Sequence, residues 1–168
     1  MSIIRPLRVF TPKIGKNCFI AENAVIIGDV TIGDDCSIWY GVVLRGDVNT
    51  IKIGNRVNIQ DNASVHTLYQ RSVTIIGDDV SVGHNAVVHG AKVGNDVLVG
   101  MGAILMDNAE IADGSIIAAG AVVLSNEKLE PGVYAGVPAK KVKDGSEAIT
   151  AAAHKNAQGY MMYKDWYM

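Results

Sequence analysis

Three of the four histidines lie close together in the middle of this 168-residue chain: His66, His84 and His89. Histidine is the side chain that most often binds metal ions in proteins. Three neutral imidazoles and one water molecule make an open tetrahedral zinc site, which is the catalytic kind. Zinc lowers the pKa of such a water from roughly 15.7 to about 7 and so makes hydroxide available at neutral pH. These residue types therefore suggest metal-hydroxide chemistry, provided that the fold brings them together.

The spacing of His84 and His89 argues against a site on one strand or one helix. They lie five residues apart in the segment VSVGHNAVVHG, residues 80–90. On a strand, this spacing places two side chains on opposite faces, and on a helix it gives neither an i,i+3 nor an i,i+4 pair. The element that positions them must therefore change direction between them.

An aliphatic residue recurs every six positions along most of the chain, and Gly or Ala often follows it. The series runs through Ile14, Ile20, Ile26, Ile32, Ile38, Leu44, Ile53, Ile59, Val65, Ile76, Val82, Val88, Val93, Val99, Leu105, Ile111, Ile117 and Val123. The aliphatic residues are mainly β-branched, with 21 Val and 18 Ile against 7 Leu, and there are 18 Gly. This composition favours strands joined by tight turns over helices.

The six-residue period resembles that of the hexapeptide-repeat proteins, whose fold is a left-handed parallel β-helix. The match covers residues 14–123. In that fold three hexads form one triangular coil, so residues about 18 apart stack at the ~4.8 Å spacing of neighbouring strands. The left hand is implied by the resemblance alone, since parallel crossovers are right-handed in roughly 98% of cases. We therefore expect a mainly β fold class with the aliphatic positions inside.

The chain is expected to form a single domain over residues 1–168, as is usual for this length. The β-helix should occupy about residues 14–128, followed by a Pro- and Gly-rich exit segment over 129–145. Residues 146–167 read as a C-terminal α-helix, with Ser146 as its N-cap. We expect the Tyr, Met and Trp side chains of this helix to cover a flank of the β-helix or of a neighbouring subunit.

The six-residue period also predicts which histidines share a face. One interruption of the period, at residues 67–73, is interpreted as a loop. With this loop, His66 and His89 stack on one face, and Asp61 and His84 stack on another, each pair being 23 residues apart. These two faces of one chain point away from each other. A threefold trimer could set one face of a subunit against the other face of its neighbour, so that two histidines from one chain and one from the next meet at a metal ion.

Three segments together resemble the gamma-class carbonic anhydrases: LRGDV (44–48), VNIQDNASVH (57–66) and VGHNAVVHG (82–90). The resemblance implies a homotrimeric lyase, a carbonate dehydratase, in which three histidines bind Zn2+, or Fe2+ or Co2+, across the subunit interface. The matching ligands are His66, His84 and His89. The implied reaction is the hydration of CO2 to bicarbonate by metal-bound hydroxide.

The same resemblance implies roles for five further residues. Arg45 and Asp47 match the Arg-x-Asp pair that forms inter-subunit salt bridges near the site. Gln60 and Asp61 match the Gln-Asp that holds the hydroxide and supports the trimer contact, and Asn58 matches the Asn before them.

The chain differs from the family pattern at the positions that would carry protons away from the site. Val48 and the loop at 67–72 replace acidic residues of the best-characterised member. The resemblance therefore implies metal binding more directly than fast hydration.

Two other functions stay open. One is a hexapeptide-repeat acyltransferase that uses acetyl-CoA and a single histidine as base, and the other is a non-catalytic, metal-binding assembly protein. The segment GVPAK (136–140) is a common exit from the β-helix in enzymes of either kind. Three clustered histidines, where acyl transfer needs one, favour the metalloenzyme.

Composition argues against several other classes. With 15 basic and 17 acidic residues the chain offers no basic field for nucleic acid. It has no apolar run long enough for a membrane span and no signal-peptide pattern, so we expect a cytoplasmic protein. Cys18 and Cys36, 18 residues apart at inward positions, are expected to be stacked, reduced core thiols. His154, in the C-terminal helix, is expected to be an ordinary surface residue.

Overall fold

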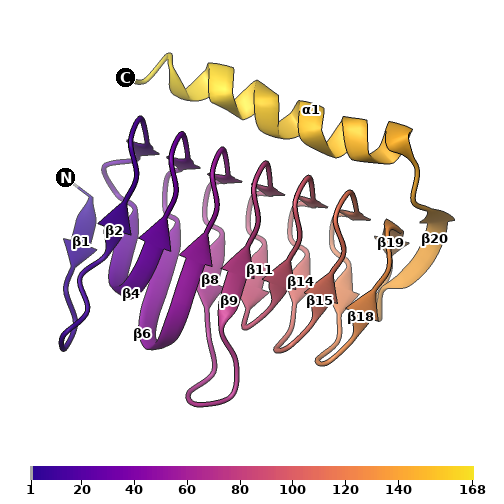
Figure 1. Ribbon diagram of the computed structural model, residues 1–168, viewed down its shortest axis with the longest axis horizontal. Helices are drawn as coiled ribbons and strands as arrows, with labels where there is room; N and C mark the ends of the chain where they lie inside the picture. The colour runs from indigo at the N-terminus through magenta and orange to yellow at the C-terminus, as the bar shows by residue number, and fades with distance from the viewer. Residues whose placement is uncertain (1) are drawn as a thin grey trace.

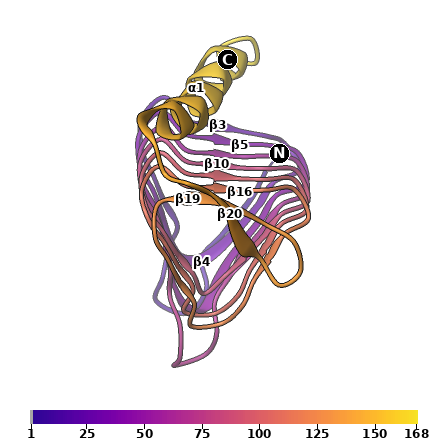
Figure 2. The same ribbon diagram turned by 90° about the vertical axis from the view of Figure 1, so that its right-hand side faces the viewer.

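The computed structural model describes residues 2–168 as a left-handed parallel β-helix with one long helix along it (Figures 1 and 2). The view along the axis shows a triangular prism, with the helix lying over one corner (Figure 2). The strands are β1 (Ile3–Arg5), β2 (Lys13–Ile14), β3 (Phe19–Ile20), β4 (Val25–Ile32), β5 (Ser37–Ile38), β6 (Val43–Ile53), β7 (Asn58–Ile59), β8 (Ser64–His66), β9 (Thr74–Ile76), β10 (Ser81–Val82), β11 (Val87–His89), β12 (Lys92–Val93), β13 (Leu98–Val99), β14 (Ile104–Leu105), β15 (Glu110–Ile111), β16 (Ile116–Ile117), β17 (Val122–Val123), β18 (Lys128–Leu129), β19 (Gly132–Ala135) and β20 (Lys140–Asp144). The helix is α1 (Glu147–Lys164).

The coils stack in the register that the six-residue period predicts. Leu44 pairs with Val65, Val65 with Val88, and Val88 with Leu105, and all four side chains are fully buried. Columns of this kind fill the prism with aliphatic side chains, so the β-helix is a packed core rather than a tube. The predicted fold class is confirmed.

The corners of the prism depend on residues that tolerate a positive φ. Asn17, Asp35, Asn62, Asp79 and Asn85 all lie near φ +55°. Asn and Asp adopt this left-handed conformation more readily than other residues with a Cβ. The Asn and Asp side chains between the aliphatic positions therefore turn the chain from one side of the prism to the next.

The interpretation of residues 67–73 as a loop is confirmed. Ile53 pairs with Ile76 on the second side of the prism, so the chain between Val65 and Ile76 makes one hexad and then leaves the coil. This loop joins β8 to β9 and projects beyond the other turns (Figure 1). It lies directly after His66 in the chain.

Both ends of the chain add strands to the β-helix. At the N-terminus, β1 pairs in parallel with β4, so ordered structure begins well before residue 14. At the other end, β19 joins the third side of the prism, and β20 pairs with it antiparallel. The exit segment at 129–145 is therefore a strand pair that closes the end of the prism.

Helix α1 lies against the side of the prism formed by the eight-stranded sheet, where it contacts β5, β10 and β13. Ser146 is its N-cap and accepts a hydrogen bond from the backbone of Ile149. Ile149, Ala153 and Ala157, spaced four apart, form its buried stripe. The small alanines let the helix approach the sheet closely. No helix within residues 2–168 has the length and apolar character of a membrane span.

Cys18 and Cys36 are free thiols at equivalent places in the first two coils. Each precedes one residue of the Phe19–Ser37 pair, so the two cysteines stack on neighbouring strands. Cys36 is fully buried, and Cys18 is half-buried. The expected stacking is confirmed, whereas only Cys36 is a core thiol.

Candidate metal centre

His66 and His89 lie side by side on β8 and β11 and are paired in register. Their ring centroids are 5.1 Å apart, and His66 Nδ1 lies 3.1 Å from His89 Nε2. In a tetrahedral site with bonds of about 2.0–2.1 Å, two nitrogen ligands lie roughly 3.3 Å apart. These two nitrogens therefore have a separation that suits one shared metal ion.

The second nitrogen of each ring is held by a carboxylate. His66 Nε2 lies 2.9 Å from Asp47 Oδ1, and His89 Nδ1 lies 3.0 Å from Asp107 Oδ1. Arg45 Nη1 donates to Asp47 Oδ2 at 2.5 Å. Burial raises the pKa of Asp47, but hydrogen bonds from His66 and Arg45 and the charge of Arg45 outweigh it and hold that pKa below its ordinary value. Asp47 is therefore an ionised acceptor that orients the His66 ring.

His84 occupies the corner that follows β10, on the eight-stranded side of the prism. Its Nδ1 lies 3.0 Å from Asp61 Oδ2, which confirms the predicted stacking of these two residues. Its Nε2 faces the hydroxyl of Tyr160, at 3.5 Å. Burial raises the pKa of Tyr160, and the Asp61 charge adds to this, so the phenol stays protonated and available as a donor.

Gln60 and Asn58 lie on the same side as His84 and are almost fully buried. Asn58 Nδ2 donates to Ser81 Oγ at 2.8 Å, and Gln60 Nε2 donates to Asn58 Oδ1 at 2.9 Å. Asn58 thus fixes the amide of Gln60. Gln60 and His84 both line a groove of about 400 Å³ that continues between β13, β16 and α1.

The predicted site residues therefore form two groups on different sides of one chain. Arg45, Asp47, His66 and His89 make the first group, and Asn58, Gln60, Asp61 and His84 make the second. The three predicted ligands do not meet within residues 2–168 of a single chain.

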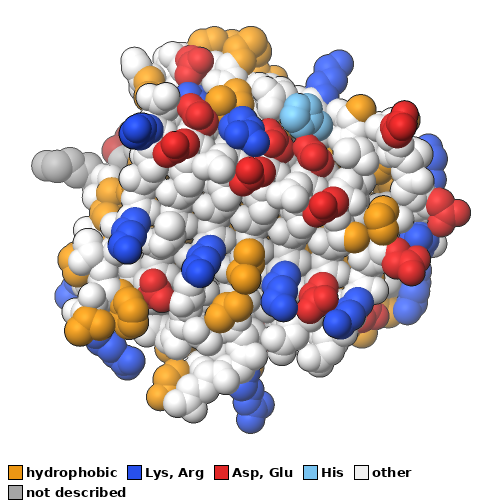
Figure 3. All heavy atoms as spheres, viewed as in Figure 1, with side chains coloured by type: hydrophobic (Ala, Val, Ile, Leu, Met, Phe, Trp, Pro, Cys, Tyr) orange, Lys and Arg blue, Asp and Glu red, His pale blue; other side chains and the backbone are white. Residues whose placement is uncertain are grey.

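Within residues 2–168, one other cluster has metal-ligand residue types: Asp79, Asp96 and His154, whose ligand atoms lie within 4.8 Å of one another. Arg56 already binds both carboxylate oxygens of Asp79, at 2.9 and 2.6 Å. His154 Nδ1 lies 2.7 Å from Asp96 Oδ1, and Gln158 Nε2 donates to Asp79 at 3.2 Å. A cation here would have to displace Arg56, so the cluster serves to attach α1 to the corners of the β-helix. Figure 3 shows a gathering of acidic side chains beside α1.

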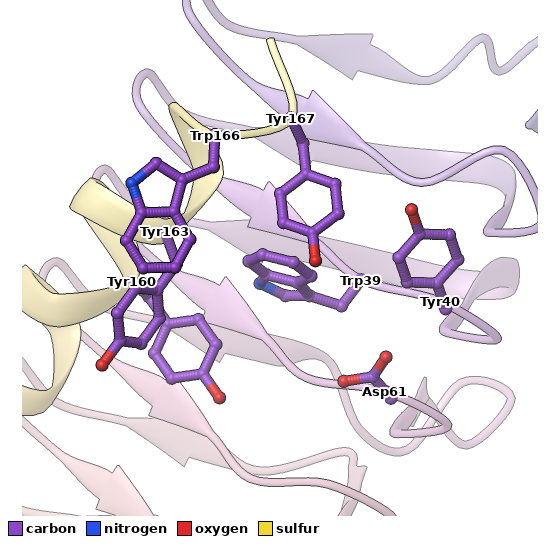
Figure 4. Close-up of a pocket in the computed structure, with 7 residues that line it drawn as sticks. All are labelled: Trp39, Tyr40, Asp61, Tyr160, Tyr163, Trp166 and Tyr167. Atoms are coloured by element: carbon purple, nitrogen blue, oxygen red, sulfur yellow. The ribbon is translucent and has the colours of Figure 1, made fainter.

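A second pocket, of about 270 Å³, lies between the C-terminal residues and the first coils (Figure 4). Its walls are aromatic side chains and one carboxylate, contributed by Trp39, Tyr40, Asp61, Tyr160, Tyr163, Trp166 and Tyr167. The ring of Trp39 meets that of Tyr167 at 90° and that of Tyr160 at 77°, which is the favourable edge-to-face geometry. The C-terminal aromatics thus pack on the flank that carries His84.

Two residues of this site were not predicted from the sequence: Asp107, which orients His89, and Ser72, which binds Asp107. Val88 pairs with Leu105, only 17 residues further on, so the stacking rule aligns His89 with Met106, and Asp107 lies one residue beyond it. The rule that joined Asp61 to His84 therefore gave only an approximate signal for Asp107. Ser72 gave no such signal, since it lies in the loop where the period is interrupted.

Comparison with known proteins identifies the family. The family described as "Bacterial transferase hexapeptide (six repeats)" matches residues 11–46 and 90–125, and "Hexapeptide repeat of succinyl-transferase" matches residues 73–106. The chain is 45% identical to the carbonic anhydrase of Geobacillus kaustophilus, over 86% of this chain and 80% of that protein. The chain belongs to the gamma carbonic anhydrase-like family of hexapeptide-repeat proteins.

Three further proteins are similar to this gamma carbonic anhydrase-like chain over most of its length. It is 42% identical to Protein YrdA of Escherichia coli, over 99% of this chain and 94% of that protein. It is 43% identical to gamma carbonic anhydrase 2, mitochondrial, of Arabidopsis thaliana, over 90% of this chain but only 56% of that protein. The crystal structure of a hexapeptide transferase family protein from Anaplasma phagocytophilum superimposes with a TM-score of 0.93 at 40% identity and covers 99% of this chain and 98% of that one. The family relatives support a carbonic anhydrase-like, lyase-type enzyme with a metal cofactor.

Proposed function

We propose that this protein is a homotrimeric metalloenzyme that hydrates CO2 to bicarbonate, with Zn2+, or Fe2+ or Co2+, held at subunit interfaces by His66 and His89 of one chain and His84 of the next. One observation carries the proposal. Each of these three histidines has one ring nitrogen held by an aspartate and the other turned toward another histidine or a pocket. A carboxylate on the far nitrogen is the usual partner of a metal-bound histidine, because it fixes the tautomer and raises ligand basicity.

The donor set suits the proposed metals. Neutral imidazole nitrogens match Zn2+, Fe2+ and Co2+ better than they match Ca2+ or Mg2+, which prefer oxygen ligands. Zinc bound by these residues would supply a water with a pKa near 7. With an aspartate on one nitrogen of each ring, the other nitrogen is the candidate ligand: Nε2 of His84 and His89, and Nδ1 of His66.

Gln60 is proposed to orient the attacking oxygen. Its Nε2 donates to Asn58, so its side-chain oxygen is the atom that would accept a hydrogen bond from the attacking oxygen. It lines the same groove as His84 and therefore lies beside the proposed ligand. Arg45, Asp47 and Asp61 are proposed to carry the charges that join neighbouring subunits as well as to hold the histidines.

Loss of the proton after each turnover is the proposed slow step. The loop at 67–72 contains no carboxylate, and Val48 is apolar, so no acidic shuttle lies in either position. We therefore propose slow hydration that depends on external buffer to carry the proton.

Purification without chelators and a comparison of His84→Ala with His154→Ala test this function. His154 is the matched control, because it is the fourth histidine and lies in the cluster that attaches α1. We expect wild type and His154→Ala to retain metal and CO2 hydration, and His84→Ala to lose both. The proposal would be contradicted if the wild-type protein contained no divalent metal, or if His84→Ala contained as much metal as a fully loaded protein.

An acyltransferase is the second candidate, favoured by the similarity to a structure described as a hexapeptide transferase family protein. A thermal shift with acetyl-CoA, and release of free thiol from it, would support this reading. A metal-bound trimer with neither activity would indicate a non-catalytic assembly role. The two free cysteines fit the cytoplasmic location that we propose.

A further inference from the structure

We propose that Asp107 and Ser72 are positioning residues for His89, and that the loop at 67–73 is a latch that sets the geometry of the metal ligands. The inference rests on the proposed function, because it concerns the same histidines. It gives the loop at 67–73, which contains no carboxylate side chain, a role in the site.

Asp107 lies in the turn after β14, one coil beyond His89. Its Oδ1 is 3.0 Å from His89 Nδ1, and this atom also accepts a 2.7 Å hydrogen bond from Ser72 Oγ. An ionised carboxylate has no proton to donate, so the shared proton resides on His89 Nδ1. His89 Nε2 then faces His66 Nδ1, at 3.1 Å.

Ser72 joins this carboxylate to the loop. Its Oγ donates to Asp107 and accepts from the backbone N–H of Leu68 at 2.9 Å. Its own N–H donates to the Leu68 carbonyl at 3.2 Å, and only 3% of the residue is exposed. Both hydrogen-bonding functions of this hydroxyl are therefore used, and they tie the loop to the residue that orients His89.

The end of the loop fixes the backbone of both histidines. Thr74 Oγ1 donates to the His66 carbonyl at 2.6 Å and accepts from the N–H of Gly90 at 3.0 Å. Gly90, directly after His89, has φ +62°, and a Cβ there would overlap Ser72 Oγ and Asp107 Oδ1. Only glycine allows the loop to approach His89 this closely.

These contacts complete a set in which each proposed ligand has its own aspartate: Asp47 for His66, Asp61 for His84 and Asp107 for His89. Loss of such a partner commonly weakens metal binding by about 10–100-fold. Asp107 acts through His89 and is not placed to touch substrate, so its effect should fall on metal affinity rather than on folding.

The first test measures Zn2+ affinity by competition with a chromophoric chelator. We expect Asp107→Ala to bind Zn2+ about 10–100-fold more weakly than wild type. Asp107→Asn should recover part of the loss, because an amide oxygen still accepts from His89 Nδ1. Ser72→Ala should show a smaller loss in the same direction. Glu110→Gln is the matched control, because it removes a carboxylate that pairs only with the exposed Lys92 and Lys128.

Two further measurements separate positioning from structure. The thermal midpoint of the metal-free protein should be unchanged in Ser72→Ala and Asp107→Asn. Nitrogen-15 NMR of metal-free wild type should show the Nδ1–H tautomer at His89, and Asp107→Ala should lose that preference.

The outcomes distinguish the two proposals. Wild-type Zn2+ affinity in Asp107→Ala, or an Nε2–H tautomer at His89 in the wild type, overturns the positioning role and leaves the metalloenzyme standing. A wild-type protein that shows the Nδ1–H tautomer but binds no divalent metal overturns the proposed function, while the orientation of His89 by Asp107 holds. A metal-free Asp107→Asn protein that unfolds far below the wild-type midpoint makes Asp107 structural and also overturns the positioning role.

Discussion

Hydrogen bonds to ring nitrogens decide what each histidine can do. His66, His84 and His89 are only partly buried, and without partners each ring could rotate and exchange tautomers. The carboxylates remove that freedom. The loss of conformational entropy that fixes each ring therefore occurs during folding and not when a ligand binds. His154 also has an aspartate partner, but that pair joins α1 to the corner between β12 and β13.

The two stacked thiols, Cys18 and Cys36, should differ in how their reactivity depends on pH. Hydrogen bonding from the Cys36 thiol lowers the pKa of Cys18 from 9.0 to about 7, against the raising effect of burial. Hydrogen bonding to Cys18 and burial raise the pKa of Cys36. Because the thiolate is the reactive form, alkylation of Cys18 by iodoacetamide should increase through pH 7, whereas Cys36 stays unreactive in the folded protein.

Mass spectrometry of peptides after timed alkylation checks this expectation. In Cys36→Ala the largest cause of the lowered pKa is absent, so the midpoint for Cys18 should move to higher pH. An identical pH profile in wild type and Cys36→Ala would contradict the assigned cause.

At the level of the elements, the stacked strands of the β-helix position the histidines, and the segments outside the repeat add side chains that contact them. The rungs place His66 beside His89 in strict register. The loop at 67–73 and helix α1 then bring in Ser72 and Tyr160, which lie outside the repeat. Stacked rungs and corner turns follow from a periodic sequence, whereas the contacts of the loop and the helix depend on where those segments come to rest.

The docking of α1 gives a prediction with an adjacent control. Ala153 is fully buried against the β-helix, and Ala152 beside it is exposed. Ala153→Glu would bury a carboxylate without a partner, so the free energy of unfolding should fall by about 2–4 kcal/mol. Ala152→Glu should leave it within about 0.5 kcal/mol of wild type.

Urea denaturation followed by circular dichroism measures both variants. Equal stability of Ala153→Glu and Ala152→Glu would show that α1 does not pack on the β-helix through this face. We also expect Tyr160, which α1 carries to His84, to become more exposed in Ala153→Glu, with a matching change in tyrosine fluorescence.

At the scale of the whole molecule, the two groups of site residues lie on different sides of the prism. His66 and His89 belong to the twelve-stranded sheet, and His84 follows a strand of the eight-stranded sheet. One chain therefore does not bring the three proposed ligands together. In the trimer that we propose, each interface would set one of the two groups against the other.

Mixed oligomers test this arrangement. His84→Ala and the double variant His66→Ala/His89→Ala should each fail to bind metal as pure proteins. When they are co-refolded in equal amounts, half-sites left intact in the two variants should meet at some interfaces. Random threefold mixing restores about a quarter of the wild-type number of sites.

Metal content per chain and the mass of the assembly in solution are the measurements. Zinc bound by the mixture but by neither parent confirms sites shared between subunits. No gain on mixing, with mixed trimers shown to be present, would contradict the proposed interface.

The sequence by itself determined the repeating parts. The six-residue period predicted the β-helix, and the 23-residue spacing predicted that His66 stacks on His89 and that Asp61 meets His84, because coil length fixes which residues are neighbours. Tertiary structure alone decided the contacts of the non-periodic parts: Ser72 on Asp107, Tyr160 beside His84 and β20 against β19. In a repeat, the spacing of the residues determines which of them are neighbours. A loop, a hairpin or a helix outside the repeat has no fixed spacing, and its contacts are set by the free energy of packing over the whole molecule.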